Sequence, residues 1–193
     1  MCNKFTKKKM TIHELFVNTC NKHPDKIMIY FKDEEWRFRD IEEFSNQVAH
    51  FFSSRGYKRG DSIAVFMDNK PQYVGLLLGL SKVGMIAALI NTNLVMESLV
   101  HCISVGNTKA IVFDHSLWQP VADVVGRLRE ANPSFATFVI DSPDRFGPAP
   151  AAHIGDTVDL DQALRRMNKL PLPRNILSAG SSTDTLCYIY TSG

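Results

Sequence analysis

The chain has 193 residues, of which 45% are hydrophobic and 22% are charged, as in an ordinary soluble globular protein. Its formal net charge at pH 7 is +2, which gives no reason to expect a nucleic acid partner. The four cysteines form no C-x-x-C pair, so we expect neither a zinc site nor a disulfide framework, and a reducing compartment is favoured.

Residues 1–10 form a basic N-terminal tail that contains Lys4, Lys7, Lys8 and Lys9. We interpret these lysines as a solvated end of the chain, while a membrane-surface or targeting role is the alternative. The stretch lacks an apolar core, so no signal peptide is expected.

The first predicted helix begins after Thr11, which can act as its cap with Glu14 three residues later, and it ends at His23. Residues 27–31 and 36–38 are rich in aromatic and β-branched side chains. Together they predict two short strands that form a hairpin.

A longer helix is expected next, with Asp40 and Glu43 as its capping pair and Gly56 at its C-terminal end. Its apolar positions recur at helical spacing and predict a buried face. These positions are Ile41, Phe44, Val48, Phe51 and Phe52.

A regular alternation of strands and helices follows. Strands are expected at residues 62–67, 85–90, 109–113 and 136–140. The helices between them are expected after the cap Asn69, with Pro71 in its first turn, and at residues 96–105 and 117–131. These strand–helix–strand units repeat about every 23–27 residues. Such a repeat predicts an α/β fold with a largely parallel sheet and helices on both faces.

Residues 74–90 are apolar enough to be tested as a membrane span, and they contain the spacing Gly75-x-x-x-Gly79. Ser81, Lys82 and Gly84 divide the stretch into two runs that are shorter than the roughly 20 residues a bilayer requires. We therefore expect a buried helix, a turn and a buried strand, and no transmembrane segment.

The end of the chain contains the candidate site. Residues 142–156 predict a long surface loop, and residues 160–167 predict a short helix. Residues 186–190 then predict a strand that is buried on both faces. This strand leads into Thr191, Ser192 and Gly193. Hydroxyl groups and a residue without Cβ suit a loop that binds phosphate, although a strand followed by a polar turn is the alternative.

Other nucleotide and metal motifs are missing from the sequence. No G-x-G-x-x-G follows a predicted strand, and no G-x-x-x-x-G-K-[ST] occurs, so neither a dinucleotide turn nor a Walker loop is indicated. The six histidines show no i, i+4 pair, and no metal site is expected.

Residues 188–193, Tyr-Ile-Tyr-Thr-Ser-Gly, resemble the opening half of the AMP-binding signature of adenylate-forming enzymes. Residues 36–41 and 80–84 are similar to two earlier motifs of that superfamily. Residues 66–76 and 87–94 resemble the fatty acid transport proteins, also called very long-chain acyl-CoA synthetases. Val95 departs from this family, which usually has arginine at that position.

The resemblance implies that residues 11–193 are the N-terminal portion of an AMP-binding domain that ends inside its phosphate-binding loop. Tyr190 would lead into this loop, and Thr191, Ser192 and Gly193 would begin it as nucleotide-binding residues. The resemblance assigns no catalytic residue within the 193 residues, which alone are expected to bind ATP poorly and to lack ligase activity.

The implied activity of the full-length parent is ATP-dependent fatty acyl-CoA ligation coupled to fatty acid transport. A long-chain or very long-chain fatty acid would be the substrate, with ATP, Mg²⁺ and coenzyme A. The parent would associate with the endoplasmic reticulum or plasma membrane through segments absent here, with this domain facing the cytosol. Alternatives are a catalytically silent truncated product or interaction module, and an unrelated nucleotide-binding α/β domain.

Overall fold

The computed structural model describes residues 10–140, 155–173 and 182–190, which form two compact units. We call the first the helical unit; it comprises Met1–Gly60, Asn69–Met85 and Met167–Leu186. We call the second the sheet unit; it comprises Asp61–Asp68, Ile86–Arg166 and Cys187–Gly193. The loop expected at residues 142–156 lies almost entirely outside the described residues.

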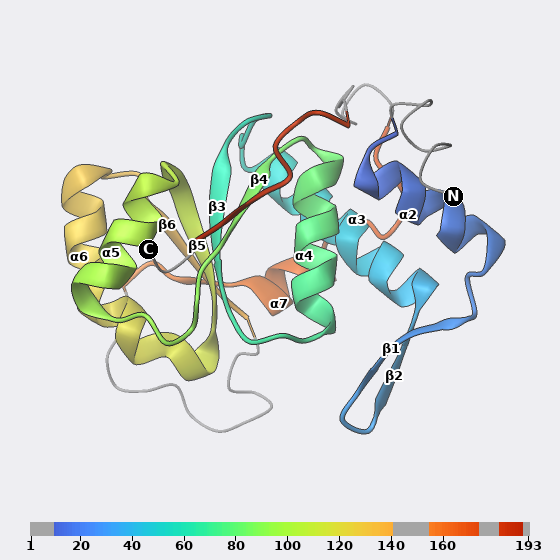
Figure 1. The fold of residues 1–193 in the computed structure, drawn as a ribbon, viewed down its shortest axis with the longest axis horizontal. Helices are drawn as coiled ribbons and strands as arrows, with labels where there is room; N and C mark the ends of the chain where they lie inside the picture. The colour runs from blue at the N-terminus through green and yellow to red at the C-terminus, as the bar shows by residue number, and fades with distance from the viewer. Residues whose placement is uncertain (1–9, 141–154, 174–181, 191–193) are drawn as a thin grey trace. The chain divides into compact units, whose positions relative to one another are not determined.

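The sheet unit is built on six parallel strands in the order β7-β6-β5-β3-β4-β8 (Figure 1). The strands are β3 (Ser62–Phe66), β4 (Ile86–Leu89), β5 (Thr108–Asp114), β6 (Ala136–Ile140), β7 (Val158–Asp159) and β8 (Cys187–Ile189). The predicted α/β class with a parallel sheet is confirmed. Every residue of β3 is buried, as expected for a central strand.

Helices flank this sheet. The sheet unit contains α5 (Met96–Val105), the 3₁₀ turn η1 (His115–Leu117), α6 (Trp118–Ala131) and α7 (Leu160–Arg165). Helices α5 and α6 lie side by side against the sheet in Figure 1 and contribute to one hydrophobic core. This core joins Leu99 and Ile103 of α5 to Val121 and Leu128 of α6 and to Phe113 of β5.

The expected burial of the last strand on both faces is wrong. β8 pairs with β4 alone among the described strands, so it lies at an edge of the sheet. Ile189 is 73% exposed and Tyr188 is 37% exposed. An apolar strand is buried on both faces only where other elements cover both faces. In the described part of the chain, no element covers the side chain of Ile189.

The helical unit contains α2 (Ile12–Lys22), the antiparallel hairpin β1 (Ile27–Phe31) and β2 (Glu34–Arg37), and the helices α3 (Phe38–Ser54) and α4 (Pro71–Lys82). The predicted capping box of α2 is confirmed: Thr11 N–H donates to Glu14 Oε2 at 2.7 Å, and Glu14 N–H donates to Thr11 Oγ1 at 3.3 Å. The predicted hairpin is confirmed as well.

Two predicted helix caps are wrong. Strand β2 runs directly into α3, so Arg37 is the N-cap and the Asp40 carboxylate accepts from Arg37 N–H at 2.7 Å within the first turn. Helix α4 begins at Pro71, and its N-cap is Lys70 rather than Asn69. A residue before proline is held in extended conformation, which makes Lys70 the last non-helical residue.

The apolar stretch at residues 74–90 is a helix, a turn and a strand, as predicted. None of the helices in the described ranges is long and apolar enough to cross a membrane. Gly75 and Gly79 face α3 instead: a Cβ on Gly79 would lie 2.6 Å from Val48 Cβ, and one on Gly75 would lie 2.3 Å from the Phe44 ring. The Gly-x-x-x-Gly spacing therefore serves close helix packing inside the helical unit.

Candidate functional site

The predicted phosphate-binding residues begin where β8 ends. In a parallel sheet the carboxyl ends of all strands lie at one edge, which is where ligands bind in open α/β sheets. β8 ends at Ile189, so Tyr190 stands at this edge. Of the four predicted site residues, the structure describes Tyr190, whereas Thr191, Ser192 and Gly193 lie outside the described residues.

The side chain of Tyr190 is half-buried and packs against the core of the sheet unit. A Cβ on Gly106 would lie 2.5 Å from the Tyr190 hydroxyl oxygen. That oxygen is buried and has no hydrogen-bond partner among the described residues. Burial raises the pKa of Tyr190, with smaller contributions from Cys102 and Tyr188. The phenol therefore stays protonated at neutral pH and is held inside the unit.

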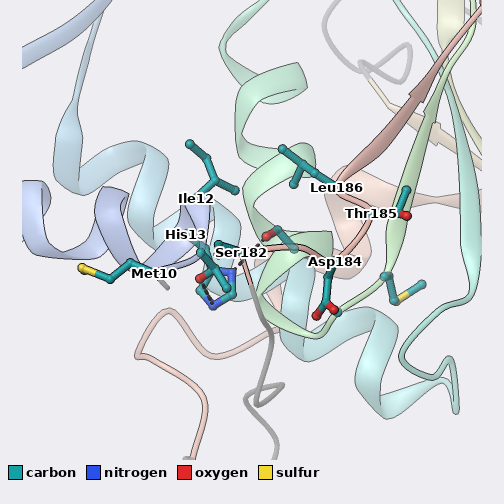
Figure 2. Close-up of a pocket in the computed structure, with 11 residues that line it drawn as sticks. Met10, Ile12, His13, Ser182, Asp184, Thr185 and Leu186 are labelled. Atoms are coloured by element: carbon teal, nitrogen blue, oxygen red, sulfur yellow. Dashed lines mark hydrogen bonds between the residues drawn. The ribbon is translucent and has the colours of Figure 1, made fainter. Parts of the chain in front are cut away.

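The helical unit contains a cavity of about 130 Å³ that is lined by residues at the start of α2, at and after the end of α4, and by Ser182 and residues 184–186 (Figure 2). Its polar wall is formed by His13, whose Nδ1 lies 2.9 Å from Ser81 Oγ and whose Nε2 lies 3.2 Å from Thr11 Oγ1. Asp184, also on this wall, forms an ion pair of 2.5 Å with Arg59. His13 and Asp184 thus already bind other side chains of the helical unit.

Burial lowers the pKa of His13, and the nearby Lys82 ammonium lowers it further. The carboxylates of Glu14 and Glu42 oppose this effect without reversing it. His13 is therefore neutral at pH 7, and its two ring nitrogens act as one donor and one acceptor between two hydroxyl groups.

A second cavity of about 290 Å³ has both His13 and Lys82 in its wall. The Lys82 side chain is only 2% exposed, and its Nζ lies 2.8 Å from Ser45 Oγ, 2.6 Å from Asn46 Oδ1 and 2.8 Å from Glu42 Oε2. Burial lowers the pKa of Lys82, and the Glu42 carboxylate partly offsets this. The ammonium group thus donates two hydrogen bonds, to Ser45 and Asn46, and forms an ion pair with Glu42.

Sequence reasoning missed this polar cluster. Lys82 was recognised only as a residue that interrupts an apolar run, and the signal that could have located the cluster is a single lysine within a buried helix. Such a lysine needs partners, because an unpaired buried charge is costly. The described groups around Lys82 Nζ supply these partners, so we interpret the cluster as structural.

No group of three or more metal-binding side chains occurs among residues 10–140, 155–173 and 182–190. Neither cavity includes Tyr190 in its wall.

Residues 16–193 match the family model described as AMP-binding enzyme. Human long-chain fatty acid transport protein 1 is 35% identical over 185 residues, which cover 95% of this chain and 27% of that protein. The medium/long-chain-fatty-acid–CoA ligase FadD6 of Mycobacterium tuberculosis is 25% identical over 186 residues, covering 96% of this chain and 28% of that ligase. The chain thus spans about a quarter of the length of these relatives.

Solved structures share the fold. The anthranilate CoA ligase AuaEII, in complex with anthranoyl-AMP, aligns with a TM-score of 0.79 and 18% identity over 96% of this chain and 33% of that one. The N-terminal domain of FACL13 from Mycobacterium tuberculosis aligns with a TM-score of 0.69 and 21% identity, covering 95% of this chain and 42% of that one. Because the family model covers nearly the whole sequence, the chain belongs to the AMP-binding enzyme family.

Proposed function

We propose that this chain is part of an ATP-dependent fatty acyl-CoA ligase that also acts as a fatty acid transport protein. The observation that carries the proposal is the 35% identity to human long-chain fatty acid transport protein 1 over 95% of the chain. The similarity to a bacterial fatty-acid–CoA ligase supports the same chemistry. The proposed substrate is a long-chain or very long-chain fatty acid.

The reaction has two steps. In the first, the fatty acid carboxylate attacks the α-phosphorus of ATP, and the bond to the β-phosphate oxygen breaks to release pyrophosphate. In the second, the coenzyme A thiol loses its proton and attacks the acyl carbon, and AMP leaves with the bonding electrons. Negative charge builds on phosphate oxygens in the first step, so hydrogen-bond donors fixed around them lower its barrier.

Within this chain, Tyr190 leads into the proposed phosphate loop, and Thr191, Ser192 and Gly193 begin it. The hydroxyls of Thr191 and Ser192 would donate to phosphate oxygens, and Gly193 would let backbone N–H groups approach them. The position of Tyr190 just beyond a parallel strand supports this assignment. Mg²⁺ would arrive with the ATP phosphates, since it is commonly held through them with few protein carboxylates.

The proposal includes membrane association of the complete protein, at the endoplasmic reticulum or the plasma membrane, with this domain facing the cytosol. No helix in the described part of the chain could provide a span. In this proposal, segments outside this chain make the membrane contact.

The test is fatty-acid-dependent release of pyrophosphate by the complete protein, measured first without coenzyme A to isolate adenylation. A series of fatty acids from medium to very long chains then defines the substrate. We expect release above the no-enzyme background with long chains. No release with any fatty acid would contradict the proposal and favour a catalytically silent interaction module.

The site assignment is tested by the double variant Thr191→Ala, Ser192→Ala. Hydrogen bonds to charged groups contribute about 1.5–3 kcal/mol each, so losing two of them should reduce kcat/KM for ATP by roughly 10² to 10⁴. The matched control is Ser182→Ala with Thr185→Ala, which removes the same two hydroxyl types from exposed positions just upstream. Equal effects of the two double variants would refute the assignment.

A further inference from the structure

Gly106 ends helix α5 in a conformation that does not require glycine. Its φ of −72° and ψ of −1° lie in the right-handed region, which any L-residue adopts. Alanine would be favoured there over glycine if the backbone alone decided, because glycine loses more conformational freedom on folding. The backbone conformation thus gives no reason for glycine at this position, whereas the space around it does.

The space belongs to Tyr190. A Cβ on Gly106 would lie 2.5 Å from the Tyr190 hydroxyl oxygen, 3.2 Å from Thr108 Cγ2 and 3.5 Å from Ala88 Cβ. Only the first of these distances is shorter than any that real Cβ atoms show. Thr108 cannot easily give way, since its hydroxyl donates to Ile103 O at 3.0 Å. The phenol therefore occupies room that exists because residue 106 has no side chain.

Within the described ranges, the end of β8 has few other interactions to hold it. The strand pairs with β4 over three residue pairs, and its last residue, Ile189, is 73% exposed. Tyr190 is the first side chain after the strand, and it packs into the core of the sheet unit beside α5. Its ring is thus the anchor of the strand end that leads to residues 191–193.

We propose that Gly106 is a positioning residue for the nucleotide site, because the room it leaves for the Tyr190 phenol fixes the strand end from which the phosphate loop begins. This inference rests on the proposed function and extends its site to a residue 84 positions earlier in the sequence, on a different element. Gly106 touches no substrate in this scheme and acts only through Tyr190.

The ring and the hydroxyl of Tyr190 have separable effects. The hydroxyl oxygen is the atom that a Cβ at position 106 would strike, and it has no hydrogen-bond partner among the described residues. Removing this oxygen in Tyr190→Phe keeps the anchoring ring and makes room for a methyl group at position 106. The effect of Gly106→Ala should therefore depend on whether residue 190 is tyrosine or phenylalanine.

The experiment is a double-mutant cycle on the complete ligase, with the KM for ATP in pyrophosphate release as the readout. In the wild-type background, Gly106→Ala should raise this KM by about tenfold or more, while the KM for the fatty acid stays within about twofold. In the Tyr190→Phe background, the same substitution should change the KM for ATP by less than about twofold. Tyr190→Ala, which removes the ring without a clash, should also raise the KM for ATP.

The matched control is Gly126→Ala on α6, where a Cβ would meet nothing within 4 Å. It should leave both KM values unchanged and should not lower the thermal midpoint. If Gly106→Ala fails to fold in the wild-type background, recovery of folded protein in the Tyr190→Phe background gives the same evidence for the contact. The KM for ATP of the Tyr190→Ala variant then shows whether the anchored ring affects the nucleotide site.

Three outcomes would overturn the inference. The first is an unchanged KM for ATP in Gly106→Ala, the second is an equal effect in both backgrounds, and the third is parallel loss of ATP and fatty acid binding, which indicates general damage. An inactive wild-type protein is a different result: it refutes the proposed function and removes the site that Gly106 would position.

Discussion

Lys82 Nζ lies 2.8 Å from Glu42 Oε2 at a position where the lysine side chain is only 2% exposed. The contact joins the last turn of α4 to the first turns of α3 within the helical unit. Desolvating two charges is expensive, so such a pair adds little net stability compared with apolar residues, yet removing one partner leaves the other uncompensated.

Lys82→Met should therefore lower the free energy of unfolding by about 3–5 kcal/mol, measured by chemical denaturation. The control is Lys169→Met, which breaks a surface pair of 2.9 Å with Glu43, also on α3, whose side chains are 62% and 44% exposed. That loss should be about 0–1 kcal/mol. Adding Glu42→Gln to Lys82→Met should recover part of the stability. Similar losses for the two lysine variants would show that the buried contact is not important.

Val65→Asp should destabilise the protein severely. Val65 is 1% exposed in β3, which pairs with both β4 and β5. An unpaired buried carboxylate costs several kcal/mol or more, so thermal unfolding should shift strongly downward, or folded protein should be lost. Ile189→Asp in the edge strand is the control and should change stability by about 0.5 kcal/mol or less, because its side chain is 73% exposed. A Val65→Asp protein with normal thermal stability would contradict the central position of β3.

The two glycines of α4 should differ in their response to alanine. A Cβ on Gly79 would lie 2.7 Å from the backbone oxygen of Ser45, which cannot rotate away, whereas one on Gly75 would meet the ring of Phe44. Phe44 is only partly buried, so its ring can move aside. We expect Gly79→Ala to cost about 1–3 kcal/mol in unfolding free energy and Gly75→Ala to cost less. The reverse order in thermal unfolding would contradict this packing of α4 on α3.

Stability should fall as the pH decreases below the ordinary histidine value, in part because of His13. Burial lowers the pKa of His13 in the folded protein below its ordinary value of 6.5, so the unfolded chain binds this proton more readily. The stabilising contribution of neutral His13 to the free energy of unfolding is fully present above about pH 6.5. It is lost as the pH falls through the folded-state pKa.

Between about pH 7 and pH 5, the free energy of unfolding should consequently decrease less in His13→Gln than in the wild-type protein. His101→Gln, which replaces an exposed histidine, is the control for loss of a histidine as such. Identical pH profiles for wild type and His13→Gln would rule out the expected linkage.

Much of the fold was readable from the sequence because its signals are local. The helix at Met96–Val105 and the strand at Ala136–Ile140 have the predicted limits, since apolar periodicity and flanking glycine, asparagine and proline act within a few residues. The parallel sheet followed from the regular spacing of strands and helices, because such connections are nearly always right-handed. The family followed from short sequence motifs.

Other features were decided by contacts between distant segments. Asp40 was predicted as a cap and is an interior residue of the first turn, because the end of β2 determines where α3 begins. The edge position of β8 depends on which strands pair, and its own apolar residues carry no information about a missing neighbour.

The candidate site divides in the same way. Residue types alone pointed to Tyr190, Thr191, Ser192 and Gly193, because hydroxyls and glycine after a strand suit phosphate. Only the tertiary structure shows that the Tyr190 phenol turns into the core and fills the room beside Gly106. Steric fit between residues 84 positions apart depends on how α5 and β8 pack, and no local pattern encodes it.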